Sequence, residues 1–96
     1  MENIPKSVKY LNFKYEYCKK IRNIPNSIKY LNFAGNYNES IDDLPDSIIK
    51  LKLSYDFNQE VNNLPQNLLI LELGSKFNQP IDKLPKKLVE RSGQCN

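Results

Sequence analysis

The sequence predicts a mainly-β solenoid, a short stack of similar units whose strands form one parallel sheet. Three observations support this prediction. The chain of 96 residues repeats itself every 20 residues without a gap. Each unit opens with an apolar residue followed by proline, and the four full units then carry apolar residues at alternate positions. Self-similarity at a fixed period is typical of repeat proteins, in which each unit packs only against its neighbours.

Four full units and one partial unit make up a single predicted domain over residues 1–96. Their boundaries are residues 4–23, 24–43, 44–63, 64–83 and 84–96. The proline at the second position of each unit fixes its own φ and holds the preceding residue extended, so a long helix cannot cross this point. We expect a turn here, closed by the polar side chain two places after the proline. These side chains are Ser7, Ser27, Ser47 and Asn67.

The middle of each full unit has the period-two pattern of a short strand. Leu31 and Phe33 illustrate it, and the same positions hold Leu11 and Phe13, Leu51 and Leu53, and Leu71 and Leu73. Side chains two residues apart on a strand point to the same side, so we expect these residues to fill the core. Successive units would stack their strands about 4.8 Å apart.

An aromatic residue follows each strand, and a small polar residue or cysteine comes next. The aromatic residues are Tyr17, Tyr37, Phe57 and Phe77, and the residues after them are Cys18, Asn38, Asn58 and Asn78. We expect the rings to be buried. We expect the asparagines to form a buried ladder, in which each side chain bonds the backbone of a neighbouring unit.

The fifth unit departs from the pattern of the other four. Arg91 and Gly93 stand where the fourth unit has Leu71 and Leu73. We therefore expect no strand here, but either a polar cap or a frayed end. At the other end, the edge strand near Leu11 is expected to be uncovered. An exposed sheet edge can pair with another chain, so an edge-strand homodimer is one hypothesis.

The fourth unit, LPQNLLILELGSKFNQPIDK, resembles an FNIP repeat, whose pattern is LPxSLxxLxLGxxFNQPI and which is a relative of leucine-rich repeats. Residues 44–63 keep Phe57-Asn58-Gln59 but have Glu60 in place of the proline, and the first two units are looser. The resemblance covers residues 4 to about 90. It implies a leucine-rich-repeat-like solenoid, right-handed and curved, that binds proteins. It also implies an origin in social amoebae or in large DNA viruses that infect amoebae.

In relatives with this resemblance, an F-box that recruits a ubiquitin ligase often precedes the repeats. The first unit of this chain begins at residue 4, so we expect no F-box and do not transfer the ligase role.

Composition argues against several classes of function. The chain has no histidine, and its two cysteines, Cys18 and Cys95, form no CxxC pair. We therefore predict no catalytic residues, no cofactor and no metal site, and hence no enzyme. No apolar run approaches the roughly 18 residues of a membrane span. With no secretory signal and two cysteines expected to be reduced, we predict an intracellular protein, cytoplasmic and within a host cell if viral.

The net charge of +3 is unevenly distributed. Residues 1–40 hold seven Lys/Arg against three Glu, which gives +4, and residues 41–96 hold seven against eight Asp/Glu, which gives −1. Nucleic-acid binders usually carry a denser basic stripe. Weak nucleic-acid binding through the basic half is therefore the least favoured binding hypothesis, and strong salt dependence would support it.

The outward positions of the strands are the candidate binding residues, because they would line the concave face of the sheet. The outward residues are Tyr10, Asn12, Lys14, Tyr30, Asn32, Ala34, Lys50, Lys52, Ser54, Ile70, Glu72 and Gly74. The candidate site consists of Tyr10, Asn12, Lys14, Tyr30, Asn32, Lys50 and Lys52. Tyrosine is favoured at interfaces because it buries a large area and keeps one polar tip. Cross-strand tyrosine and asparagine pairs can also serve the sheet alone.

The sequence thus predicts a protein–protein interaction module with an unknown protein partner and no small-molecule substrate. Two alternatives remain open. The chain could be the substrate-recognition part of a ubiquitin ligase assembled in trans, or a truncated repeat remnant without a dedicated partner.

Overall fold

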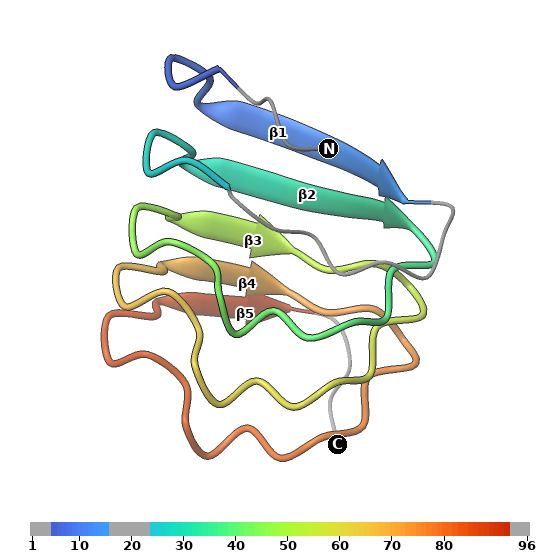
Figure 1. Cartoon of the computed structure of the whole chain (residues 1–96). Coiled ribbons are helices and arrows are strands. Elements are labelled where there is room, and N and C mark those ends of the chain that lie inside the picture. The colour runs from blue at the N-terminus through green and yellow to red at the C-terminus, as the bar shows by residue number, and fades with distance from the viewer. Residues whose placement is uncertain (1–4, 16–23, 93–96) are drawn as a thin grey trace.

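Five parallel strands form one sheet in chain order (Figure 1). The computed structural model describes residues 5–15 and 24–92. The strands are β1 (Tyr10–Tyr15), β2 (Tyr30–Gly35), β3 (Lys50–Lys52), β4 (Ile70–Glu72) and β5 (Glu90–Ser92). Within these residues there is no helix. The predicted architecture, mainly β with one short parallel strand per unit, is confirmed.

The register of the sheet reproduces the period of the sequence. Leu11 pairs with Leu31, Leu31 with Leu51, and Leu51 with Leu71. Each strand residue therefore lies beside its equivalent in the next unit, 20 positions later along the chain. Figure 1 shows that the chain returns from the ends of β2, β3 and β4 to the start of the next strand along a single side of the sheet. The core lies between the sheet and these return segments.

Apolar columns fill this core as the alternation predicts. Leu31 is 2% exposed, and Leu51 and Leu71 are fully buried. The aromatic column is also confirmed where the structure describes it. Phe33 stacks on Tyr37 with ring centroids 4.5 Å apart, and the rings of Phe57 and Phe77 lie parallel at 6.2 Å. Tyr17, Cys18 and Cys95 lie outside the described residues.

A tight turn forms at each Leu-Pro or Ile-Pro step. The Val8 amide donates to the Pro5 carbonyl at 3.2 Å, and the equivalent bond closes the turn in all five units. Two of the serines expected to close these turns, Ser27 and Ser47, instead connect units. Ser27 Oγ donates to the Val8 carbonyl at 2.7 Å, and Ser47 Oγ donates to the Ile28 carbonyl at 2.8 Å. The small hydroxyl reaches across because neighbouring units lie only one strand spacing apart.

The asparagine ladder is present, but the prediction that it is buried is wrong. Asn38 Oδ1 accepts the Asn58 amide at 2.8 Å, and Asn58 Oδ1 accepts the Asn78 amide at 2.7 Å. Asn58 is half-buried, whereas Asn38 and Asn78 are exposed, because this bend lies at the surface of the return segments. Gln79 adds a second contact that the sequence did not suggest. Its Nε2 donates to both the carbonyl and Oδ1 of Asn58.

Replacing Asn58 with alanine should lower the free energy of unfolding by about 1 kcal/mol. The change removes the acceptor of the Asn78 amide and one of the two acceptors of Gln79 Nε2, and water can replace only part of this bonding at a half-exposed site. Asn58→Asp is the matched control, because a carboxylate keeps the acceptor. Urea denaturation of both variants measures the difference. Equal losses for alanine and aspartate would show that the Oδ1 acceptor does not stabilise the bend.

The expectation that the fifth unit lacks a strand is also wrong. β5 pairs in register with β4, with Arg91 beside Leu71. The Val89 and Glu90 amides both donate to the Leu69 carbonyl, at 2.8 and 3.1 Å, as the equivalent residues do in the other units. Main-chain bonds need no particular side chain, so the ladder continues past the point where the apolar pattern ends.

Candidate functional site

The alternation that buries leucine and phenylalanine turns two columns of side chains outward from the sheet. The first column, in strand order, is Tyr10, Tyr30, Lys50, Ile70 and Glu90. The second is Asn12, Asn32, Lys52 and Glu72. Members of one column are cross-strand neighbours, so side chains that are 20 residues apart in sequence come into contact range.

The two tyrosines form a stacked pair at the β1 end of the sheet. Their ring centroids are 4.6 Å apart and their planes differ by 12°. Tyr10 is 71% exposed and Tyr30 37%, so the pair presents a large apolar surface to solvent. Neither hydroxyl bonds any residue within 5–15 or 24–92. The pair therefore offers both ring surface and two polar tips.

Asn12 and Asn32 lie next to the tyrosines in the second column and face each other across β1 and β2. Their side-chain amides make no hydrogen bond to the part of the chain that the structure describes. The ladder asparagines differ, since Asn38 and Asn58 both accept bonds from the next unit. Two asparagines on the sheet thus keep donors and acceptors that the fold does not use.

Lysine residues continue both columns on β3. Lys50 Nζ lies 3.7 Å from Glu72 Oε2, and both side chains are partly exposed. Lys52 is exposed, and no described carboxylate lies within 4 Å of its ammonium. Glu72 was outward in the sequence prediction but was not assigned to the candidate site. Its register beside Lys52 was the signal that could have identified it.

These side chains surround one hollow of about 500 Å³ on the outer face of the sheet. We call it the groove, and its lining residues are Tyr10, Leu11, Asn12, Tyr30, Leu31, Asn32, Lys50, Lys52 and Glu72. The structure therefore brings six of the seven predicted site residues together. The seventh, Lys14, pairs with Ala34 through its backbone on β1, and its side chain lies outside the described part.

The prediction that Ser54 faces outward is wrong. β3 ends at Lys52, and the chain then bends so that Ser54 is 3% exposed. Its Oγ donates to the Tyr37 carbonyl at 2.6 Å, because a buried hydroxyl needs a partner. Gly74, at the same position of the next unit, lies close to the Ser54 carbonyl rather than on the open face. Among the described residues, the groove accordingly takes its outward side chains from the first two columns.

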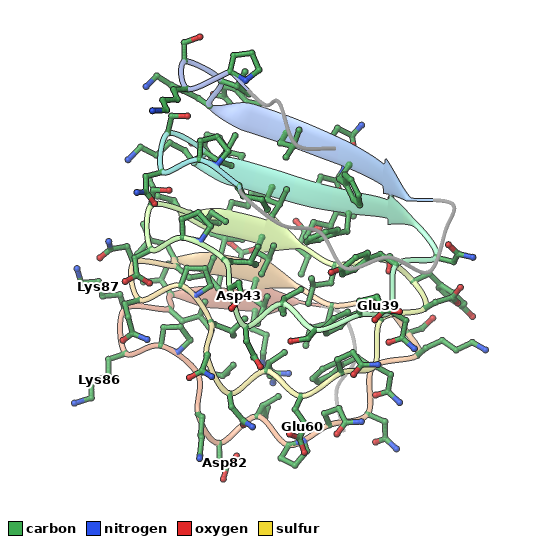
Figure 2. The ribbon with its side chains drawn as sticks, viewed as in Figure 1. Glu39, Asp43, Glu60, Asp82, Lys86 and Lys87 are labelled. Carbon is green, nitrogen blue, oxygen red and sulfur yellow. The ribbon has the colours of Figure 1, made fainter. Side chains whose placement is uncertain are left out.

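A second hollow of about 440 Å³ lies at the Leu-Pro turn of the last unit. It is lined by Gln66, Asn67, Lys83, Leu84, Pro85, Lys86 and Lys87. Lys87 Nζ donates to Asn67 Oδ1 at 2.8 Å. Figure 2 shows Lys86 and Lys87 extending from this turn into solvent. A cluster of extended lysines without a converging set of buried donors is typical of a solvated turn.

Two features are absent from the described residues. No three side chains among histidine, cysteine, aspartate and glutamate come together there as metal ligands would. No helix of membrane-spanning length and apolarity occurs in the same part of the chain.

The fold is similar to that of a solved protein. The crystal structure of CroV588, described as a novel circular LRR protein structure, superposes with a TM-score of 0.87 at 36% sequence identity. The similarity covers 98% of this chain but 15% of the length of CroV588. The fold is thus a leucine-rich-repeat-like solenoid, and the chain spans a small part of the longer protein that it resembles. A comparison with curated proteins finds no match.

The repeat pattern identifies the family. The FNIP Repeat family matches three consecutive stretches of the sequence, residues 2–36, 37–63 and 60–90. Together these stretches cover nearly the whole chain, and they include both the Leu-Pro turns and the Phe-Asn-Gln bends described above. The chain therefore belongs to the FNIP repeat family.

Proposed function

We propose that this protein is a non-enzymatic protein-interaction module that binds a partner protein through the groove on the outer face of its sheet. The observation that carries the proposal is the set of unused groups in the groove. Two tyrosine hydroxyls, two asparagine amides and the Lys52 ammonium have no partner among the described residues. They lie around a hollow of about 500 Å³.

The surrounding scaffold supports the same proposal. The sheet is held in place because every unit bonds its neighbours through the backbone, with serine bonds among the first three units and the asparagine ladder among the second, third and fourth. A rigid face needs little ordering when a partner binds, so less of the interaction energy is lost. Tyrosine-rich faces also bury a large area while losing little side-chain entropy.

The proposal includes an intracellular location and the absence of catalysis. The chain contains no histidine, and Glu72, the one carboxylate among the described residues of the groove, lies 3.7 Å from Lys50. The groove residues are therefore better suited to recognition than to proton transfer.

Affinity capture with a groove variant tests this proposal. With the triple variant Tyr10→Ala/Tyr30→Ala/Lys50→Ala, the amount of partner protein retained should fall at least about tenfold relative to the wild type. Aromatic side chains usually dominate interface energies. The measurement is quantitative mass spectrometry of proteins retained from a lysate of the source cells. A photo-crosslinking side chain at position 30 should then attach to the same partner.

A matched variant outside the groove controls for general surface effects. Tyr55→Ala/Lys76→Ala removes an exposed tyrosine and an exposed lysine from the bend after β3 and β4, and it should retain the partner fully. Both variants should unfold at nearly the wild-type temperature, since their side chains are outward. A partner that the triple variant binds as well as the wild type does would refute the groove as the interface.

A further inference from the structure

We propose that the groove binds an extended acidic segment of the partner, in which a proline packs on the Tyr10–Tyr30 pair and a carboxylate three residues later bonds Lys52. This inference rests on the proposed function and names the chemistry of the partner at the same site. It follows from the charges of the groove, the position of its aromatic pair, and the distance between the two.

The charge of the groove favours a carboxylate. Among the described residues that line it, the charged ones are Lys50, Lys52 and Glu72, which leave one net positive charge. Glu72 is 3.7 Å from Lys50, so Lys52 is the cation left to receive a partner's anion. Figure 2 shows Glu60 and Asp82 on the return segments, on the far side of the core from the sheet. Neither of these carboxylates lines the groove.

The aromatic pair favours a proline ring. Tyr10 and Tyr30 stack with nearly parallel rings, and both are exposed, Tyr10 more than Tyr30. Segments in the polyproline II conformation dock on such aromatic surfaces, because the segment is already extended and loses little entropy. This conformation also has no internal hydrogen bonds, so its carbonyls and amides need partners. Asn32, whose amide is unused, lies between the rings and Lys52, and Asn12 lies beside it on β1.

The spacing of the groove matches this conformation. From the middle of the tyrosine pair to Lys52 is about one and a half strand spacings across the sheet and two residues along it. At about 4.8 Å per strand and about 3.3 Å per residue, the diagonal is roughly 10 Å. A polyproline II helix returns to the same side after three residues and advances about 9 Å. A proline and an acidic residue in a Pro-x-x-Asp or Pro-x-x-Glu segment would therefore contact both ends.

Fluorescence anisotropy with labelled peptides tests the inference. The probes are capped peptides of about eight residues that contain Pro-x-x-Asp, with Asn or Lys at the aspartate position for comparison. The aspartate peptide should bind the wild-type protein at least about fivefold more tightly than the asparagine peptide, and tenfold more tightly than the lysine peptide. Raising the salt concentration from about 20 to about 300 mM should remove most of this preference.

Charge reversal assigns the contact to Lys52. Lys52→Glu should lower the affinity for the aspartate peptide roughly tenfold and should restore binding of the lysine peptide. Lys52→Ala, which places no new carboxylate beside Glu72, should lower the affinity for the aspartate peptide about threefold. Lys76→Glu is the matched control, because it changes the net charge equally at an exposed bend outside the groove. It should leave peptide affinity unchanged.

Several results would overturn the inference. These are no binding of the aspartate peptide at about 1 mM, equal binding of the three peptides, or equal losses for Lys52→Glu and Lys76→Glu. The proposed function fails differently. If the asparagine peptide binds as well as the aspartate peptide and Tyr10→Ala/Tyr30→Ala abolishes both, the groove is an interface but its partner is not acidic. If the triple variant Tyr10→Ala/Tyr30→Ala/Lys50→Ala retains the cellular partner as well as the wild type does, the groove is not the interface.

Discussion

Replacing Leu51 with alanine is expected to lower the free energy of unfolding by about 2–5 kcal/mol. Leu51 is fully buried on β3, the central strand, and is paired on both sides by leucines of β2 and β4. The truncation leaves a cavity between layers that cannot close, because the backbone ladders fix the strand spacing. Domains of this size are typically stable by roughly 5–15 kcal/mol, so the loss is a large fraction of the total.

Urea denaturation followed by far-ultraviolet circular dichroism measures this loss. In a solenoid each unit is stabilised by its neighbours, so damage to the central unit should also broaden the transition. Leu11→Ala is the matched control, since Leu11 occupies the same column on the outermost strand and is only half-buried. Leu11→Ala should lower the free energy of unfolding distinctly less than Leu51→Ala does. Equal losses at the two positions would contradict a continuous core centred on β3.

The fold could be predicted from the sequence because the same physical constraint recurs in every unit. A proline every 20 residues excludes long helices, and the alternation at Leu31 and Phe33 leaves only one face for the core. The inward face of each strand and the 20-residue period together determine which residues pair in the parallel sheet. The pairing that they predict, Leu11 with Leu31, is the one observed.

Side-chain patterns were a poor guide where the main chain decides. Arg91 interrupts the leucine column, yet β5 forms because the Leu69 carbonyl accepts two backbone amides regardless of side chain. The ladder at Asn58 was expected inside, but a bend that links units by hydrogen bonds needs no burial. A polar residue that repeats in every unit suggests a buried position. Here the asparagine repeats because each copy accepts a hydrogen bond from the next unit, and this bond forms at the surface as well.

The candidate site could be predicted as a set of positions but not as an arrangement. The period-two pattern placed Tyr10, Tyr30 and Lys52 on the outer face. Which groups bond one another depends on rotamers that no pattern contains. The Lys50–Glu72 pair, which leaves Lys52 as the available cation, and the parallel stacking of the tyrosines both follow from the structure alone.

Replacing Gly74 with alanine is expected to lower the free energy of unfolding by about 3 kcal/mol. A Cβ at Gly74 would lie 2.6 Å from Tyr55 Cα and 2.8 Å from the Tyr55 carbonyl oxygen, and would also meet the Ser54 carbonyl oxygen. These are backbone atoms, so no rotamer change can relieve the contact. The bend is held by bonds from the Lys76 amide to Tyr55 and from the Phe77 amide to Gly74. Thermal unfolding should therefore shift to a clearly lower temperature.

The second unit provides a control for this prediction. It already carries alanine at the equivalent position, Ala34, because β2 remains a strand as far as Gly35 and does not bend until later. Ala34→Gly should consequently cost less than about 1 kcal/mol, the usual entropic effect of glycine in a strand. If Gly74→Ala instead matched the wild type in stability, the third and fourth units would have to move apart at this bend without lowering the free energy of unfolding. The close approach of Gly74 to Ser54 would then not be part of what holds the units together.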